Sequence, residues 1–270
     1  MKTPKPAVPF YFGSPGRELF GCFHEPSAQD LRRCTVLICQ PMGHEYINSH
    51  RALRQLAVRL AEAGFPVLRF DYSGCGDSYG EAEQSSLSRW LEDISTAVAQ
   101  LRALTGTLQV CVIGLRLGGT LAAISGSRAE NFRSLVLWEP VTNGRNYLKE
   151  LLALQKEILR FRPRPKLSKK SQAYMEILGF PLSRLLHAQL EELDLNMMAE
   201  RAAERVLIVQ NATAKDDGDN LKNHLIQTRA HVDHQTVQAP KIWLPTSDGS
   251  LLVPAQVLQS MVSWLCSVSS

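Results

Sequence analysis

The sequence has few of the features that mark exported or membrane proteins. No apolar run approaches the roughly 18 residues that a membrane-spanning helix needs. The first residues, MKTPKPAVPFYF, contain lysines but lack the apolar segment of a secretory leader. We therefore expect a cytoplasmic protein without a membrane span.

Cysteine and histidine also lack the spacing that marks metal sites. The cysteines are scattered and form no C-x-x-C pair: Cys22, Cys34, Cys39, Cys75, Cys111 and Cys266. Four histidines have no partner acid at a metal-ligand spacing: His187, His224, His231 and His234. We expect reduced cysteines in the core, no disulfide framework, and neither a metal nor a cofactor.

The basic excess is small and partly local. The formal net charge is +4, and basic residues gather at Arg160, Arg162, Arg164, Lys166, Lys169 and Lys170. Such a run is typical of a solvated face or loop, and an anionic partner such as an acyl carrier protein is the alternative. Aromatic residues are not interleaved with it as single-stranded nucleic acid would favour, so we expect no nucleic acid partner.

What the sequence does contain is a regular alternation of short apolar runs and amphipathic stretches. With 270 residues and 44% hydrophobic residues, the chain can bury a large core. After an N-terminal hairpin, the predicted strands are Thr35–Gln40, Pro66–Tyr72, Gln109–Ile113, Ser134–Trp138, Val206–Asn211 and one or two within His231–Leu244. The predicted helices are Asn48–Ala63, Ser86–Leu104, one ending near Ser127, Asp217–Arg229 and Val253–Cys266. This alternation predicts an α/β fold, with a mostly parallel central sheet and helices on both faces.

One stretch interrupts the alternation. Residues 142–203 have mostly helical character and show no convincing strand. We interpret them as a helical cap inserted between the sixth and seventh strands, with residues 1–141 and 204–270 forming the core. Some aromatic and methionine side chains of the cap are expected to line a pocket for an apolar or acyl ligand.

The segment VCVIGLRLGGTLAA carries the most informative motif. It reads as a strand, a sharp turn with Gly114-x-Arg116-x-Gly118, and a helix. This is the form of the G-x-S-x-G nucleophile elbow, in which glycines flank the central residue because the turn leaves no room for a Cβ. Here arginine stands where the serine is expected.

Together with the loop QPMGHE after the third strand and FDYSGCGDS after the fourth, this elbow resembles the α/β-hydrolase superfamily over nearly the whole chain. More narrowly, GCGDS with GLRLG is similar to the hydrolase-like proteins associated with exosortase A systems and to related proteins of bacterial biosynthetic clusters. The resemblance implies a serine nucleophile at the elbow, an acid after the sixth or seventh strand, and a histidine just before the last helix.

The chain departs from that pattern at the nucleophile and at the histidine. Arg116 cannot act as a nucleophile, because a guanidinium stays protonated and has no lone pair to offer. The segment expected to hold the histidine reads WLPTSDGSLLVP, and no histidine follows His234. The acid remains open among Glu139, Asp216, Asp217 and Asp219. The usual Ser-His-Asp triad is therefore absent.

Two roles are open for Arg116, which should lie at a helix N-terminus. A cation there needs a compensating anion, and the strand order places Glu139 beside the elbow, so a structural Arg116–Glu139 ion pair is one interpretation. The other is an anion pocket, in which Arg116 binds a substrate carboxylate, phosphate or developing oxyanion.

Other residues of the same loops are candidates for the site. His44 is the best-placed general acid or base, oriented by Glu45 or Glu139, although such a histidine often serves only for capping or packing. Cys75 or Ser78 could replace the nucleophile, whereas the alternative is that GCGDS is a tight turn. The expected substrate-binding residues are Met42, Gly43, Leu115, Leu117, Cys75 and Ser78.

Two functions follow from these residues. The first is a protein that acts on a small acyl ester or thioester in a biosynthetic pathway, by hydrolysis, acyl transfer or elimination without the triad. The second is a catalytically inactive pseudo-hydrolase that binds a carrier protein, a subunit or a metabolite. The sequence does not decide between a monomer and a homodimer.

Overall fold

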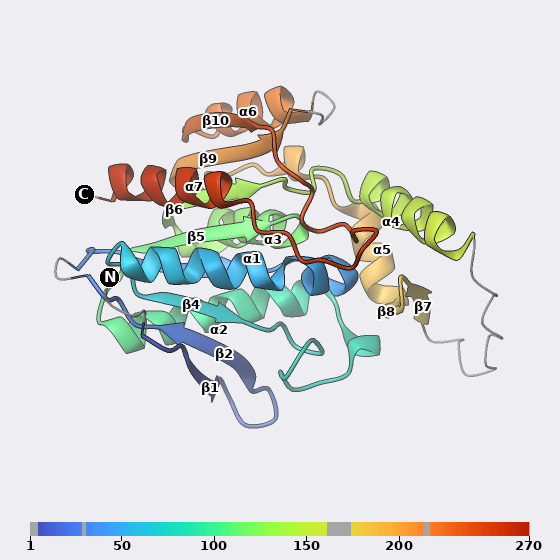
Figure 1. Ribbon diagram of the computed structural model, residues 1–270, viewed down its shortest axis with the longest axis horizontal. Coiled ribbons are helices and arrows are strands. Elements are labelled where there is room, and N and C mark those ends of the chain that lie inside the picture. Colours follow the sequence, from blue (N-terminus) through green and yellow to red (C-terminus); the bar gives the residue numbers. More distant parts are fainter. Residues whose placement is uncertain (1–4, 29–30, 161–173, 213–216, 270) are drawn as a thin grey trace.

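The computed structural model describes residues 5–28, 31–160, 174–212 and 217–269, and it is built on one eight-stranded sheet (Figure 1). The strand order is β1-β2-β4-β3-β5-β6-β9-β10, and every pair from β4 to β10 is parallel. The strands are β1 (Val8–Phe12), β2 (Leu19–His24), β3 (Thr35–Cys39), β4 (Val67–Phe70), β5 (Val110–Leu115), β6 (Phe132–Trp138), β9 (Ala203–Asn211) and β10 (His231–Val237). The predicted mostly parallel α/β sheet is confirmed.

Helices cover both faces of this sheet, as predicted. Helices α1 (Gly43–Glu62) and α7 (Ala255–Val268) pack on one face, in front in Figure 1. Helices α2 (Leu87–Thr105), α3 (Leu117–Ser125) and α6 (Asp217–Gln227) pack on the other. Along β3, Val36 and Ile38 belong to the first core while Leu37 and Cys39 belong to the second, because successive side chains of a strand point to opposite faces.

The strand order brings three loops together at the carboxyl edge of the sheet. Strand β5 lies between β3 and β6, with Cys39 opposite Gly114 and Leu115 opposite Trp138. The segments that follow these strands therefore meet at one point, which is where ligands bind in open parallel sheets. They contain the start of α1, Arg116 and Glu139.

The segment between β6 and β9 is partly strand, so the expectation that it contains none is wrong. It holds α4 (Gly144–Leu159), β7 (Tyr174–Ile177), β8 (Phe180–Ser183), α5 (Arg184–Glu192) and a short 3₁₀ turn, η3 (Leu195–Met197). Strands β7 and β8 form an antiparallel hairpin, whose two-residue turn has φ of 55° at Leu178 and 85° at Gly179. Positive φ at both central residues is the geometry that matches the twist of a hairpin.

The described parts of this segment, residues 142–160 and 174–202, are called the insertion below. In Figure 1 they lie beyond the carboxyl ends of the central strands.

Helix α1 starts earlier than the sequence pattern suggested. It begins at Gly43 instead of Asn48, which places His44 and Glu45 in its first turn. The apolar stripe begins only at Ala52, and the polar first turn before it hides the true start of the helix. None of the described helices is long and apolar enough to cross a membrane.

Candidate functional site at the elbow

The turn between β5 and α3 has a strained backbone at its central residue, Arg116. Arg116 has φ 53° and ψ −125°, outside the regions that L-residues prefer. The flanking glycines are required, because a Cβ at Gly118 would collide with the carbonyl oxygens of Cys39 and Gln40. A Cβ at Gly114 would likewise collide with the backbone of Gly119. The backbone is thus strained at Arg116 and closely packed at both flanking glycines, and the central side chain is a guanidinium.

Two carboxylates bind that guanidinium. Arg116 Nε donates to Glu45 Oε1 at 2.9 Å, and Arg116 Nη2 donates to Glu150 Oε2 at 2.7 Å. Glu45 comes from the first turn of α1 and Glu150 from α4 of the insertion. Arg116 is 7% exposed and the Glu45 side chain 3%, so water screens their bond poorly, whereas the bond to Glu150 lies at the edge of the cluster.

Two aromatic rings complete the surroundings of Arg116. Its Cζ lies 5.4 Å from the ring centroid of Tyr147 and 5.1 Å from that of Trp243. Both distances fall within the range of cation–π attraction. The Tyr147 hydroxyl also donates to Glu45 Oε2 at 2.8 Å, which ties α4 to α1. The guanidinium is thus packed between carboxylates and aromatic rings at the carboxyl edge of the sheet.

The carboxylates around Arg116 keep its guanidinium charged despite burial. Burial alone would lower the pKa of Arg116, but the carboxylates of Glu45 and Glu150 hold it above its ordinary value. Burial raises the pKa of the Glu139 carboxyl, while the Asn211 N–H and the charge of Arg116 oppose that rise. The arginine is therefore permanently charged, and its carboxylate neighbours supply the compensation that a buried cation needs.

The expected Arg116–Glu139 ion pair is not formed. Glu139 Oε1 accepts a hydrogen bond of 2.5 Å from the backbone N–H of Asn211, and its own N–H donates to Val209 O. These bonds hold Glu139 against the end of β9, while Arg116 binds Glu45 and Glu150. Of the other acids considered, Asp219 is exposed and lies 3.7 Å from His234 Nδ1, and Asp216 and the Asp217 side chain lie outside the described residues.

His44 lies near the cluster, and among the described residues no carboxylate contacts its ring. Its Nδ1 is 3.1 Å from Asn48 Nδ2, which also donates to the Trp243 carbonyl at 3.3 Å. Burial lowers the pKa of His44, so the imidazole is neutral at pH 7. Glu45, one of the two orienters expected for it, is bound to Arg116 and Tyr147 instead.

Three residues of the cluster were not predicted. Trp243 is the first residue of the segment that was expected to hold the histidine of the site but lacks one. That position in the sequence could have indicated that Trp243 lies near Arg116. Tyr147 and Glu150 are three residues apart on α4, a spacing that places them on one helix face. Nothing in the sequence indicates that this face meets the elbow, because that contact depends on how the insertion packs.

The expected substrate-binding residues around Arg116 take different places. Met42 is the N-cap of α1, and Gly43 has a φ of 54° and lies against Phe180 of β8. Leu115 and Leu117 are fully buried and pack into the cores on opposite faces of the sheet. Contact of these residues with a substrate stays a prediction.

Cys75 and Ser78 have structural surroundings. Ser78 Oγ donates to Asp71 O at 2.6 Å and accepts from Phe20 N at 2.8 Å, so it fastens the turn to β2. Burial, with smaller effects of Asp71 and Asp93, raises the pKa of the Cys75 thiol to about 12. These contacts support the tight-turn interpretation over a replacement nucleophile, which needs a lowered pKa.

We expect Cys75 to resist alkylation in the folded protein. At pH 7.5 a thiol with a pKa of about 12 is almost entirely protonated, and the thiol is not the nucleophile. Mass spectrometry after iodoacetamide treatment should therefore show Cys75 unmodified in native protein and modified in urea. Rapid labelling of Cys75 in the native state would reopen its role as a nucleophile.

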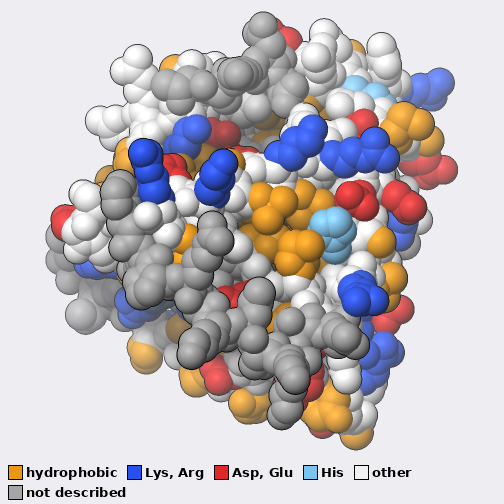
Figure 2. Space-filling view, turned by 90° about the vertical axis from the view of Figure 1, so that its right-hand side faces the viewer, with side chains coloured by type: hydrophobic (Ala, Val, Ile, Leu, Met, Phe, Trp, Pro, Cys, Tyr) orange, Lys and Arg blue, Asp and Glu red, His pale blue; other side chains and the backbone are white. Residues whose placement is uncertain are grey.

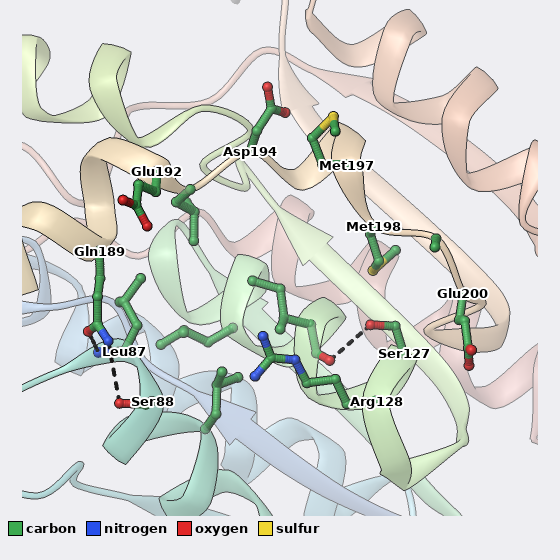
Figure 3. Close-up of a pocket in the computed structure, with 15 residues that line it drawn as sticks. Leu87, Ser88, Ser127, Arg128, Gln189, Glu192, Asp194, Met197, Met198 and Glu200 are labelled. Carbon is green, nitrogen blue, oxygen red and sulfur yellow. Dashed lines mark hydrogen bonds between the residues drawn. The ribbon is translucent and has the colours of Figure 1, made fainter.

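A groove of about 640 Å³ lies away from this cluster, on the side of α2 and α3. Its lining comes from α2, α3, α5 and the chain around η3, and it includes none of the residues that contact the Arg116 guanidinium. Figure 3 shows Arg128 extending into it, with Glu192, Asp194 and Glu200 around its rim. Among the described residues, no group of three or more His, Cys, Asp or Glu side chains is arranged to hold a metal ion.

Comparison with known proteins places this geometry in a family. The profile of the serine aminopeptidase S33 family matches residues 34–211, from the start of β3 to the end of β9. This chain belongs to the S33 family. Its fold is the α/β-hydrolase fold, as the sequence resemblance implied, and the S33 match ends before the segment that contains Trp243. No curated protein matches the chain in a sequence search.

Solved structures agree with the fold of this S33 member. Est1E of Butyrivibrio proteoclasticus, solved with ferulic acid, has a TM-score of 0.64 at 16% identity, with 96% of each chain covered. A thermostable carboxyl esterase of Bacillus coagulans has a TM-score of 0.67 at 13% identity, covering 98% of this chain and all of its own. An esterase of Pyrococcus furiosus has a TM-score of 0.65 at 12% identity, covering 98% and 91%. At these identities the likeness concerns the fold.

Proposed function

We propose that this S33 member is a pseudo-hydrolase, a binding protein that keeps the α/β-hydrolase fold without hydrolysing a substrate. The observation that carries the proposal is the Arg116 cluster. The elbow presents a buried guanidinium bound by Glu45 and Glu150 and covered by Tyr147 and Trp243. Such a group can hold or repel charge, but it cannot attack a carbonyl carbon.

The ligand of this protein, under the proposal, is an acyl ester or thioester or the carrier protein that bears it. The esterase fold and the narrower resemblance to exosortase A-associated and biosynthetic-cluster proteins support a place in a cytoplasmic biosynthetic pathway. The insertion acts as the cap of the site. Figure 2 shows hydrophobic side chains gathered on the face where α4 and α5 lie, bordered by Lys and Arg side chains on one side and by Asp, Glu and His side chains on another, and the basic side chains offer contacts to an acidic carrier. Most of the basic run, Arg162–Lys170, lies outside the described residues.

One observation favours a second candidate, turnover of an acyl ester or thioester without the triad. The elbow keeps its strained backbone at Arg116, and His44 stands on the neighbouring first turn of α1. In that mechanism Arg116 would stabilise a developing oxyanion, while neutral His44 would move the proton. Hydrolysis, acyl transfer and elimination all remain within this candidate.

A panel of acyl esters and acyl thioesters separates the two functions. We expect no turnover above background by wild type, Arg116→Ala or His44→Ala, with circular dichroism showing that all three are folded. The carboxyl esterase of Bacillus coagulans, assayed beside them, verifies the panel. Wild-type turnover that both substitutions abolish would refute the pseudo-hydrolase and establish the triad-free enzyme.

A further inference from the structure

The two carboxylates that bind Arg116 differ in how firmly they are held. The Glu45 side chain is 3% exposed, and its two oxygens accept from Arg116 and from Tyr147. The Glu150 side chain is 46% exposed, and its bond to Arg116 Nη2 is the contact that holds it to the cluster. Glu45 is therefore a fixed counter-ion, whereas Glu150 is already half exposed and becomes fully hydrated when it leaves Arg116.

A second donor lies beside Arg116, the indole N–H of Trp243. Trp243 is 2% exposed, its ring lies over the guanidinium, and its indole N–H has no hydrogen-bond partner among the described residues. An unsatisfied buried donor costs about 1–3 kcal/mol, so native proteins rarely leave one without a reason. Arg116 and Trp243 thus offer donors for an acceptor that the chain itself supplies only in part.

We propose that Arg116 and Trp243 form a subsite for the carboxylate of a ligand. In the absence of a ligand, the carboxylate of Glu150 from the same chain occupies the Arg116 side of this subsite. The proposal deepens the pseudo-hydrolase function and rests on it for the ligand class, an acyl or other organic monocarboxylate. When the ligand binds, Glu150 turns to solvent and the ligand carboxylate takes its place on Arg116 Nη2. Because α4 carries Glu150, this exchange also releases one of the contacts between the insertion and the elbow.

Charge balance selects a monocarboxylate over a phosphate dianion. With Glu150 withdrawn, the positive charge of Arg116 faces the negative charge of Glu45, and Glu139 lies close by. Exchanging one carboxylate for another leaves this balance unchanged. A dianion would add a negative charge beside two buried carboxylates, which is costly where water is excluded.

The test removes the internal occupant and supplies small carboxylates. Glu150→Ala is titrated with acetate, propionate and butyrate, and separately with phosphate, against sodium chloride at equal ionic strength, with thermal melting as the readout. Glu157→Ala is the matched control, since it removes an exposed glutamate from the same helix. We expect butyrate to bind Glu150→Ala with a Kd of about 10 mM, so that 100 mM butyrate lowers its unfolding constant about tenfold. The corresponding rise in Tm is roughly 3 °C.

Wild type and Glu157→Ala should show no such rise, and phosphate should stabilise Glu150→Ala less than butyrate does. The double variant Glu150→Ala with Trp243→Phe keeps the ring and loses the N–H, and should bind butyrate several-fold more weakly. If Glu150→Ala does not fold, Glu150→Gln against Glu157→Gln gives the same comparison.

A carboxylate response no larger in the Glu150 variant than in the Glu157 variant would overturn the subsite and leave the pseudo-hydrolase standing. Conversely, ester turnover by wild type would refute the pseudo-hydrolase and would leave the expected rise in Tm of Glu150→Ala with butyrate unchanged. The failures of the two proposals are therefore distinguishable.

Discussion

Arg116→Ala is expected to lower the free energy of unfolding by about 3–5 kcal/mol at pH 7.5, because it strands a buried carboxylate. Glu45 would keep only the Tyr147 hydroxyl as a partner at a site that is almost closed to water. Glu150 is half exposed and would simply be solvated. Urea unfolding followed by circular dichroism measures the loss, and Arg51→Ala, an exposed arginine of α1, should change the free energy by less than about 0.5 kcal/mol.

The loss of stability in Arg116→Ala should grow as the pH rises toward neutral. Burial raises the pKa of the Glu45 carboxyl, and Arg116 works against that rise. Without Arg116 the folded-state pKa therefore rises further above the unfolded value, and a raised carboxyl pKa costs stability as pH increases through that window. The difference from wild type should be smallest near pH 4.5 and grow toward neutral pH. Adding Glu45→Gln to Arg116→Ala should recover part of the loss. A deficit that is constant with pH would contradict this account.

Gly118→Ala is expected to leave no soluble folded protein, or to cost at least about 4 kcal/mol. Inside a helix alanine is normally favoured over glycine by about 1 kcal/mol, so propensity predicts the opposite sign. The close approach decides the outcome, because a Cβ here would meet the backbone carbonyls of Cys39, the last residue of β3, and of Gln40, which cannot move without disturbing the sheet.

Gly16→Ala is the matched control for this effect. Gly16 has φ of 74° and open space around it, so its substitution should cost only about 1–2 kcal/mol of backbone strain. Soluble yield and thermal melting of the two variants give the comparison. A Gly118→Ala protein as stable as Gly16→Ala would mean that the elbow backbone can relax away from β3.

The central sheet could be predicted because its strands are short, continuous apolar runs. Strands such as β5 and β6 are buried on both faces, and their apolar residues stand between turn signals. The hairpin β7–β8 escaped prediction for a local reason. Its turn is Leu178-Gly179, and leucine at a positive φ is not a residue that sequence patterns associate with such turns.

The residues that surround Arg116 could be predicted only where the strand order determines which segments are neighbours. Strand order places the start of α1 and Glu139 beside Arg116, and both are there. Which carboxylate pairs with the arginine depends on hydrogen bonds at the end of β9 and on the start of α1. The contribution of Glu150 depends on the docking of α4, which is a tertiary contact with no local signature.

The way Arg116 is held bears on what a serine at this position would do to the protein. A single mutational step to serine at the elbow would leave Glu45 buried without its cation, and Trp243 would still stand in the segment where a histidine is needed. The serine variant is therefore expected to be less stable than the present protein unless Glu45 changes with it. Arg116 is thus as much a part of the architecture that joins β5 to α1 as it is a candidate for binding a ligand.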